Sequence, residues 1–370
     1  MGFSLRVYAT LPGCYHKHMP ERFLHKRRDF LAALAAGAVV PRAAFSDPVI
    51  PNSVETSGVR LMTADTRRAI ERGLKWLAAR QNSDGAFGVG RGYGRDVGVV
   101  ALAGMGFLSS GCTAGRGPFG VEVTRATDFI LESSLPSGFI TNTHSPSHGP
   151  MYGHGFATLF LAEVYGMSPR RDLRDKLQRA VRMIVACQNH EGGWRYENVP
   201  KEADISVTVC QIMALRAARN SGIFVPKDTV DRCIDYVRGC QNRDGGFRYR
   251  LKPKSSSQFA RSAAGVVALY SAGVYEDPAI TRGLNYLKVR VPRGFMEAHY
   301  WYGQYYAVQA MYQAGDPHWE RWYTAIRDQL IRDQLPDGSW NDLTFSSEYA
   351  TAMALIILQL PNNHLPIMKR

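Results

Sequence analysis

The 370-residue chain is predicted to be all-α, a closed (α/α)6 toroid of six helical hairpin repeats, on two observations. A motif of the form Gln-x3-Gly-x-aromatic occurs four times, each time after a stretch with the apolar spacing of an amphipathic helix. The copies start 107, 53 and 93 residues apart, so the outer intervals are close to twice the middle one. A fixed period of this kind is typical of repeat architectures. The motif residues are Gln81, Gly85 and Phe87; Gln188, Gly192 and Trp194; Gln241, Gly245 and Phe247; and Gln334, Gly338 and Trp340.

A weaker copy of the motif is expected in the middle of each long interval. The segment from Ser134 to Gly138 precedes Phe139, and the segment from Arg290 to Gly294 precedes Phe295. Both segments have lost the glutamine but keep the glycine and an aromatic residue. Together with the four clear copies, these two weak copies indicate six repeats of roughly 50 residues each.

Each repeat contains two helical stretches of different character. In the third repeat, apolar residues between Leu173 and Val185 fall on one helix face. After the turn, a second helix from about Asp204 to Arg219 is apolar on more than one side. Amphipathic helices alternating with nearly apolar ones indicate an outer and an inner layer. Six hairpins without an evident polar cap favour a closed ring over an open solenoid.

The motif resembles the repeat of squalene and terpene cyclases and of the β subunits of protein prenyltransferases, the prenyltransferase and squalene oxidase repeat family. The resemblance covers roughly residues 60 to 362. It implies a toroid over residues 61–370 in which the glutamine and aromatic residues of the motif are structural. It also implies an apolar, isoprenoid-like ligand in the central cavity.

The catalytic residues of those relatives are not carried over. The Asp-x-Asp-Asp-Thr acid motif of terpene cyclases aligns with Asp204 and Thr208, but Ser206 and Val207 replace the two following aspartates. The zinc site of the prenyltransferase subunits would also need a cysteine at 206 and a histidine near Glu348. We therefore expect neither that acid nor that zinc site, no metal and no cofactor.

The first 46 residues are interpreted as a twin-arginine export signal. Arg27 and Arg28 precede Phe30 and Leu31, and a weakly apolar run and a small-residue cleavage site follow. The alternatives are a basic tail or a short membrane anchor. With a linker over residues 47–60, the mature protein is predicted to be periplasmic or secreted after export by the twin-arginine translocase.

Charge and cysteine content exclude other classes. Without the leader the net charge falls from +13 to about +8, and no nucleic-acid-binding motif accompanies it. A basic loop with Arg248, Arg250, Lys252 and Lys254 is either solvated or a contact for an anionic lipid or polymer. Five cysteines remain after the leader, with no metal-ligand spacing, so no disulfide framework is expected.

The candidate site is placed where the six inner helices begin, around the mouth of the central cavity. Polar residues at these starts are expected to bind the ligand, although the carboxylates are also common helix caps. Asp204 or Glu348 would be the catalytic acid, if the protein is an enzyme. A metal site made by Asp96, His154 and Asp204, with Glu202, is a further possibility. The predicted ligand-binding residues are Asp96, His154, Asp204, Arg261, Tyr302, Gln304 and Glu348.

Three functions fit these observations. The first is an exported toroid that binds an apolar, isoprenoid-like small molecule or lipid. The second is a carbohydrate-active enzyme that uses inner-ring carboxylates, since such toroids also host sugar chemistry. The third is a non-catalytic module that binds a protein partner.

Overall fold

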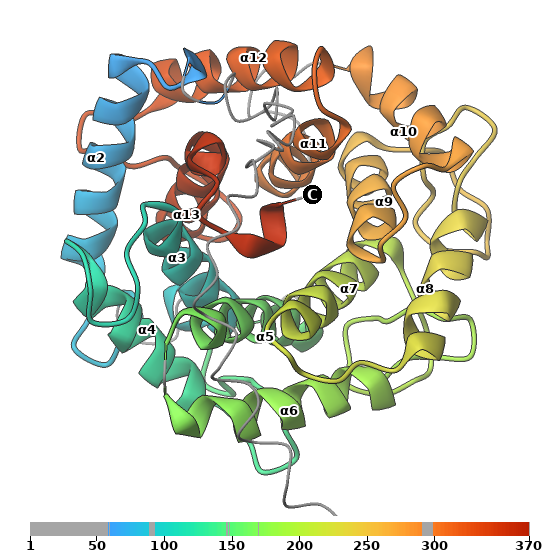
Figure 1. The fold of residues 1–370 in the computed structure, drawn as a ribbon, viewed down its shortest axis with the longest axis horizontal. Coiled ribbons are helices and arrows are strands. Elements are labelled where there is room, and N and C mark those ends of the chain that lie inside the picture. The colour runs from blue at the N-terminus through green and yellow to red at the C-terminus, as the bar shows by residue number, and fades with distance from the viewer. Residues whose placement is uncertain are drawn as a thin grey trace, which may run out of the picture. The chain divides into compact units, whose positions relative to one another are not determined.

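The computed structural model describes residues 58, 60–88, 93–145, 147, 149–168, 170–290 and 299–369. The chain divides into two units, Met1–Ile50 and Pro51–Arg370, and every described residue belongs to the second. In the described part, twelve α-helices form two concentric rings (Figure 1). The outer helices are α2 (Ala64–Arg80), α4 (Gly120–Glu132), α6 (Arg171–Ala186), α8 (Lys227–Gly239), α10 (Pro278–Lys288) and α12 (His318–Asp333); the inner helices are α3 (Val97–Ser109), α5 (Pro150–Met167), α7 (Ile205–Asn220), α9 (Phe259–Ser271), α11 (Tyr300–Ala314) and α13 (Ser347–Gln359).

The inner ring is closed by direct helix contacts. Each inner helix packs against the next, and α13 packs against both α11 and α3. The outer ring is closed in the same way by α12 against α2. Inner helices are buried on nearly all sides and outer helices on one face, as the two predicted patterns require. The predicted toroid of helical hairpins is confirmed.

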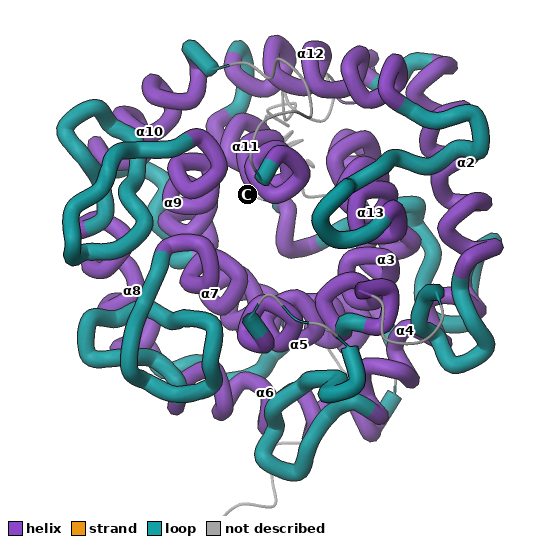
Figure 2. Tube along the Cα trace, turned by 180° about the vertical axis from the view of Figure 1, so that it is seen from behind, coloured by secondary structure: helices purple, strands orange, loops and turns teal. Residues whose placement is uncertain are grey.

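All inner helices run in the same direction. The starts of α7 and α11 meet, because the Tyr302 hydroxyl donates to the Ser206 carbonyl oxygen at 2.8 Å. The ends of α13 and α3 meet, because Gln359 Nε2 donates to the Gly106 carbonyl oxygen at 2.9 Å. We call the end where the inner helices start the mouth, and the other end the floor. The loops that connect the two rings are shown from the opposite side in Figure 2.

The motif glutamines join successive outer helices. Gln188 Nε2 donates to the Gly192 carbonyl oxygen in its own turn at 2.9 Å and to the Thr229 carbonyl oxygen of α8 at 2.8 Å. Gln334 makes the same pair of bonds to Gly338 and to Ala69 of α2, so this turn also closes the outer ring. Gln81 and Gln241 bond in the same way to their own glycines and to Glu122 and Ala279.

The motif glycines are required by both conformation and space. Gly192 has a φ of +96°, and a Cβ there would lie 2.2 Å from the Arg232 carbonyl oxygen of the next outer helix. Gly85, Gly138, Gly245 and Gly338 also have positive φ and lie against the carbonyl oxygen of an arginine in the following outer helix. The turn therefore lets the backbone approach its neighbour more closely than any side chain allows.

The motif aromatics fill the space between the rings and bond to the inner helix. Trp194 is fully buried, its Nε1 donates to the Ile184 carbonyl oxygen at 2.7 Å, and its amide donates to Thr208 Oγ1 at 3.1 Å. In the last repeat, Trp340 Nε1 likewise donates to the Leu330 carbonyl oxygen, and the Trp340 amide donates to Thr351 Oγ1.

In the second repeat, Ile140 rather than Phe139 takes the place of the motif aromatic. Ile140 forms a β-bridge with Ser134, just as the motif aromatic Phe87 forms one with Gln81. The predicted weak copy is therefore present, with its apolar residue one position later.

The last described residues close the floor. After α13 the chain forms two short 3-10 turns, Leu360–Asn362 and Pro366–Met368, and its end lies at the centre of the ring (Figure 1). Five cysteines of the described part are buried and free. No helix in that part combines the length and apolarity that crossing a bilayer requires. The predicted export signal, the linker and the weak fifth motif copy around Gly294 lie outside the described residues, Gly58 and Arg60 of the linker and Arg290 of the copy excepted.

Candidate ligand site at the mouth of the inner ring

Asp204 begins α7 and lies at the centre of the mouth site. Its Oδ1 accepts hydrogen bonds from the Ser206 and Val207 amides, each at 2.9 Å, so it caps the helix. Its Oδ2 accepts one from the Tyr249 hydroxyl at 3.3 Å. The side chain is fully buried, and this burial raises the pKa of Asp204 to about 6.

Four tyrosines from different repeats surround this carboxylate. The Tyr249 hydroxyl also bonds to the Tyr196 hydroxyl. The Tyr152 ring lies 5.9 Å from Tyr196 and 6.4 Å from Tyr302, measured between ring centroids. Burial and the negative charge of Asp204 raise the pKa of Tyr152, so its hydroxyl stays a neutral donor. The site is therefore an aromatic shell with hydrogen-bonding tips.

Three arginines flank the same shell. The guanidinium carbons of Arg195, Arg250 and Arg261 lie 5.9, 5.3 and 5.7 Å from the centroid of the Tyr249 ring, a cation–π distance. Arg195 and Arg250 share the carboxylate of Glu202, at 3.1 and 3.7 Å. No salt bridge joins Arg261 to an acid in the described residues, and its Nε is buried without a partner. The mouth therefore carries an excess of positive charge.

Below the mouth, aromatic side chains fill the interior of the ring. The Phe156 ring of α5 lies 6.1 Å from that of Tyr305 on α11, and Tyr306 lies 4.7 Å from Tyr302. The Tyr306 hydroxyl is 3.2 Å from the sulfur of Cys210 on α7. The predicted cavity is thus occupied by side chains at this level.

Asp96 caps α3 as Asp204 caps α7. Its Oδ1 accepts a hydrogen bond from the Gly98 amide at 2.8 Å, and burial raises the pKa of Asp96 to about 6. It lies beside Gly153 at the start of α5. Of the predicted polar ring, the structure places Asp204, Arg261 and Tyr302 around one shell and Asp96 at the next helix start.

His154 and Gln304 point into the helix layers. His154 is fully buried, and its Nδ1 accepts a hydrogen bond from the Ile140 amide at 3.1 Å, the role that Thr208 and Thr351 have in their repeats. Burial lowers the pKa of His154 to about 4, so the ring is neutral. Gln304 is buried two residues after Tyr302, on the opposite side of α11.

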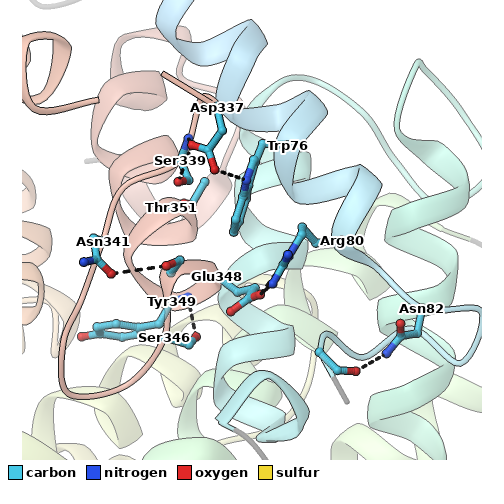
Figure 3. Close-up of polar contacts among 12 residues, drawn as sticks. Trp76, Arg80, Asn82, Asp337, Ser339, Asn341, Ser346, Glu348, Tyr349 and Thr351 are labelled. Atoms are coloured by element: carbon cyan, nitrogen blue, oxygen red, sulfur yellow. Dashed lines mark hydrogen bonds and ion pairs between the residues drawn. The ribbon is translucent and has the colours of Figure 1, made fainter. Parts of the chain in front are cut away.

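Glu348 also points away from the interior. Its Oε1 accepts hydrogen bonds from Arg80 of α2, at 3.3 Å from Nε and 3.1 Å from Nη2 (Figure 3). The Arg80 guanidinium in turn lies over the Trp76 ring. Glu348 therefore joins an inner to an outer helix, which leaves Asp204 as the predicted acid that reaches the mouth site.

Neither the alternative metal site nor the surface clefts coincide with this shell. No group of three histidine, cysteine or acidic side chains suited to a metal occurs among the described residues. His154 lies against Ile140 instead of joining Asp96 and Asp204. One surface cleft of about 760 Å3 lies between the end of α5 and the start of α6, around Arg170 and Arg174.

The predicted ligand-binding residues do not include Arg195, Arg250 or three of the four shell tyrosines, Tyr152, Tyr196 and Tyr249. A signal exists for Arg195, Tyr196 and Tyr249: an Arg-Tyr pair directly follows the motif aromatic in two successive repeats, as Arg195-Tyr196 and Arg248-Tyr249. In the structure both pairs lie on mouth loops, and their tyrosine hydroxyls meet.

Comparison with known proteins decides the family. The model of the prenyltransferase alpha-alpha toroid domain matches residues 56–296 and 225–364. The chain belongs to this family. Drimenyl diphosphate synthase of Streptomyces showdoensis is 25% identical over 185 residues, which are 50% of this chain and 33% of that protein. The toroid chain thus spans about one third of that relative's length.

Solved structures show the same fold in proteins of different activity. A variant of type II terpene cyclase MstE from Scytonema, in complex with geranylgeranyl dihydroxybenzoate, matches 81% of this chain and 98% of its own with a TM-score of 0.56 and 16% identity. Cellobiose 2-epimerase from Bacillus thermoamylovorans matches 83% of this chain and 99% of its own with a TM-score of 0.60 and 12% identity.

Proposed function

We propose that this toroid is an exported protein that binds an isoprenoid-like ligand with an anionic head. The observation that carries the proposal is the shell around Asp204, where four tyrosines and three arginines from several repeats converge. The head would lie among Arg195, Arg250 and Arg261, and the apolar chain would enter the interior past Tyr302. Because the interior is filled below the mouth, entry requires Tyr302 and Tyr306 to change rotamer.

The relatives support this choice of ligand. A terpene cyclase of the same fold holds geranylgeranyl dihydroxybenzoate, and the curated relative makes a prenyl diphosphate, drimenyl diphosphate. Guanidinium groups bind phosphate oxygens well because their donors form a planar fork. Aromatic faces suit an apolar, polarizable chain. If the ligand is also converted, Asp204 is the acid, since it is buried and its pKa lies within about one unit of neutral pH.

Binding of geranylgeranyl diphosphate and of geranylgeraniol to the purified mature protein tests the proposal. Native mass spectrometry and tyrosine fluorescence should show one molecule bound per chain, with the diphosphate bound at least tenfold more tightly than the alcohol. Products of incubation are extracted and analysed in the same samples. Cleavage of polysaccharides without binding of either prenyl compound would favour the carbohydrate-active alternative.

Export is tested separately by cell fractionation. The chain with Arg27→Lys and Arg28→Lys should stay in the cytoplasm, whereas the unchanged chain should reach the periplasm or medium. An equal distribution of both chains would contradict the twin-arginine interpretation.

A further inference from the structure

Large apolar side chains are exposed on the loops at the mouth end of the ring. The connections that run from an outer to an inner helix all lie at this end. Each of the five exposed residues on these connections is at least 40% exposed: Leu135, Val199, Val289, Leu335 and Leu343. At the floor end, the connection from α7 to α8 carries one such residue, Phe224, which is 82% exposed.

Two of the mouth residues replace an asparagine of the repeated turn. In the first and third repeats, the residue after the motif glutamine is Asn82 or Asn189, and its side chain hydrogen-bonds to the backbone of its own connection. In the second and sixth repeats, the same position is held by Leu135 and Leu335, which are 42% and 40% exposed. A leucine cannot make the bonds of the asparagine, so the structure of the turn does not account for these two side chains.

Leu343 is presented to the solvent by a well-held loop. The side chain of Asp342 accepts hydrogen bonds from the amides two and three residues further on, at 2.8 and 2.6 Å. The Phe345 ring anchors the loop, because it lies 5.3 Å from the Tyr93 ring and 5.1 Å from the Tyr349 ring, measured between centroids. Between these fixed residues Leu343 is 96% exposed. The loop therefore holds a large apolar side chain in water, where it gains nothing from burial.

The connection from α8 to α9 adds positive charge to the same end. Residues 240–258 include five arginines and lysines but one acid, Asp244. Arg250 lies 3.7 Å from the carboxylate of Glu202. Lys252 and Lys254 are exposed, and neither makes a salt bridge within the described part of the chain. Exposed apolar side chains beside unpaired cations are the features that bind a protein to the surface of an anionic bilayer.

We propose that the mouth end docks on an anionic phospholipid bilayer. Leu343 and Val289 would enter the interface, and Lys252 and Lys254 would lie against the headgroups. A bilayer fits better than a protein, because the exposed apolar residues stand on separate loops, whereas a protein interface has a contiguous apolar core. The proposal goes beyond the proposed function and does not require it, since docking needs no bound prenyl compound.

Cosedimentation of the full mature chain with lipid vesicles tests the docking. One set of vesicles is phosphatidylcholine, and the other is phosphatidylcholine with phosphatidylglycerol at a ratio of about 2:1. The chain should bind the anionic vesicles at least tenfold more tightly. This preference should disappear at about 0.5 M salt, because salt screens the attraction between the lysines and the headgroups.

Serine variants separate the mouth from the floor without changing the charge. Leu343→Ser with Val289→Ser should weaken binding to the anionic vesicles at least fivefold. Phe224→Ser removes a similarly exposed side chain at the floor and should leave binding unchanged. Lys252→Gln with Lys254→Gln should abolish the preference for anionic vesicles and leave binding to phosphatidylcholine as it was. Equal melting temperatures confirm that the variants fold, and the lysine pair tests the mouth by itself if the serine pair does not.

The outcomes distinguish this proposal from the proposed function. A chain that binds neither kind of vesicle, or that loses as much binding with Phe224→Ser as with the mouth pair, overturns the docking. Binding of geranylgeranyl diphosphate without binding of vesicles overturns the docking and leaves the proposed function intact. Binding of anionic vesicles through the mouth without binding of any prenyl compound supports the docking and contradicts the proposed function.

Discussion

The turns that end the outer helices and the starts of the inner helices lie at the same end of the ring but differ in kind. The turns repeat one set of bonds: Gln188 and Gln334 each join their own glycine to the next outer helix. The inner starts differ from repeat to repeat, with Asp204 in a tyrosine shell, His154 in the core and Glu348 paired to Arg80. Repetition therefore marks what holds the ring together, and departure from it marks where a ligand can be recognised.

The largest effect is expected from a turn aromatic. Trp194→Ala removes a fully buried indole and its bond to Ile184, and should lower the free energy of unfolding by about 4 kcal/mol. Tyr249→Phe, at the mouth, leaves Asp204 Oδ2 without this donor and should lower it by about 1–2 kcal/mol. Urea unfolding of both variants measures the two losses in free energy of unfolding. Comparable losses would show that the motif turns stabilise the ring no more than the mouth residues do.

A smaller effect isolates the close approach of the turn. Gly192→Ala must adopt positive φ and also places a Cβ against the Arg232 carbonyl oxygen. Gly222→Ala has a similar φ, +86°, but meets nothing within 4 Å. Gly192→Ala should lower the free energy of unfolding by about 3 kcal/mol. Gly222→Ala should lower it by about 1 kcal/mol, because only the strain of the left-handed backbone acts there. Thermal unfolding with equal losses for both would show that the contact with α8 does not matter.

The contribution of Asp204 to the free energy of unfolding should depend on pH, whereas the hydrogen bonds of the motif turns should not. The pKa of Asp204 is about 6 in the folded chain, above its ordinary value of 3.8, so its contribution is complete below about pH 4 and is lost as pH rises through about 6. Asp204→Asn keeps the helix cap and removes the charge. It should therefore match the unchanged chain at pH 4 and exceed its stability by about 1–3 kcal/mol at pH 7.5. Parallel stability curves for the two chains across this range would contradict the buried carboxylate.

The smallest effect concerns binding. An ionised Asp204 repels an anionic head, so affinity for geranylgeranyl diphosphate should rise a few fold between pH 7.5 and pH 5. The diphosphate itself titrates in this range, and the Asp204→Asn variant serves as the control. Calorimetry should show a smaller pH dependence in the variant than in the unchanged chain. The same dependence in both would place the head away from Asp204.

The ring could be predicted because its signals are local and repeated. A glutamine, a glycine and an aromatic residue at fixed spacing report one turn each, and the apolar pattern on both sides reports the two helix layers. That Asp204, Arg261 and Tyr302 lie around one shell could be predicted because a toroid brings equivalent helix starts together; their role as ligand-binding residues stays a prediction.

The rest of the site depends on which way side chains point. Glu348 lies in the first turn of α13 but is directed to Arg80 of an outer helix, whereas His154 lies one turn inside α5, at the position that Thr208 holds in α7. Glu163, near the floor end of α5, was not predicted, since a single acid within that apolar helix belongs to no motif. Segment 363–369 has no motif, so its place in the floor follows from tertiary packing alone.

The most direct test of the account compares two arginines. Arg261→Gln removes a mouth guanidinium that has no acid partner, while Arg243→Gln removes an exposed one from the neighbouring turn. Calorimetric titration with geranylgeranyl diphosphate should show affinity reduced at least tenfold by Arg261→Gln and unchanged by Arg243→Gln, with equal melting temperatures. Equal affinity in both variants would contradict a ligand head at the mouth of the inner ring.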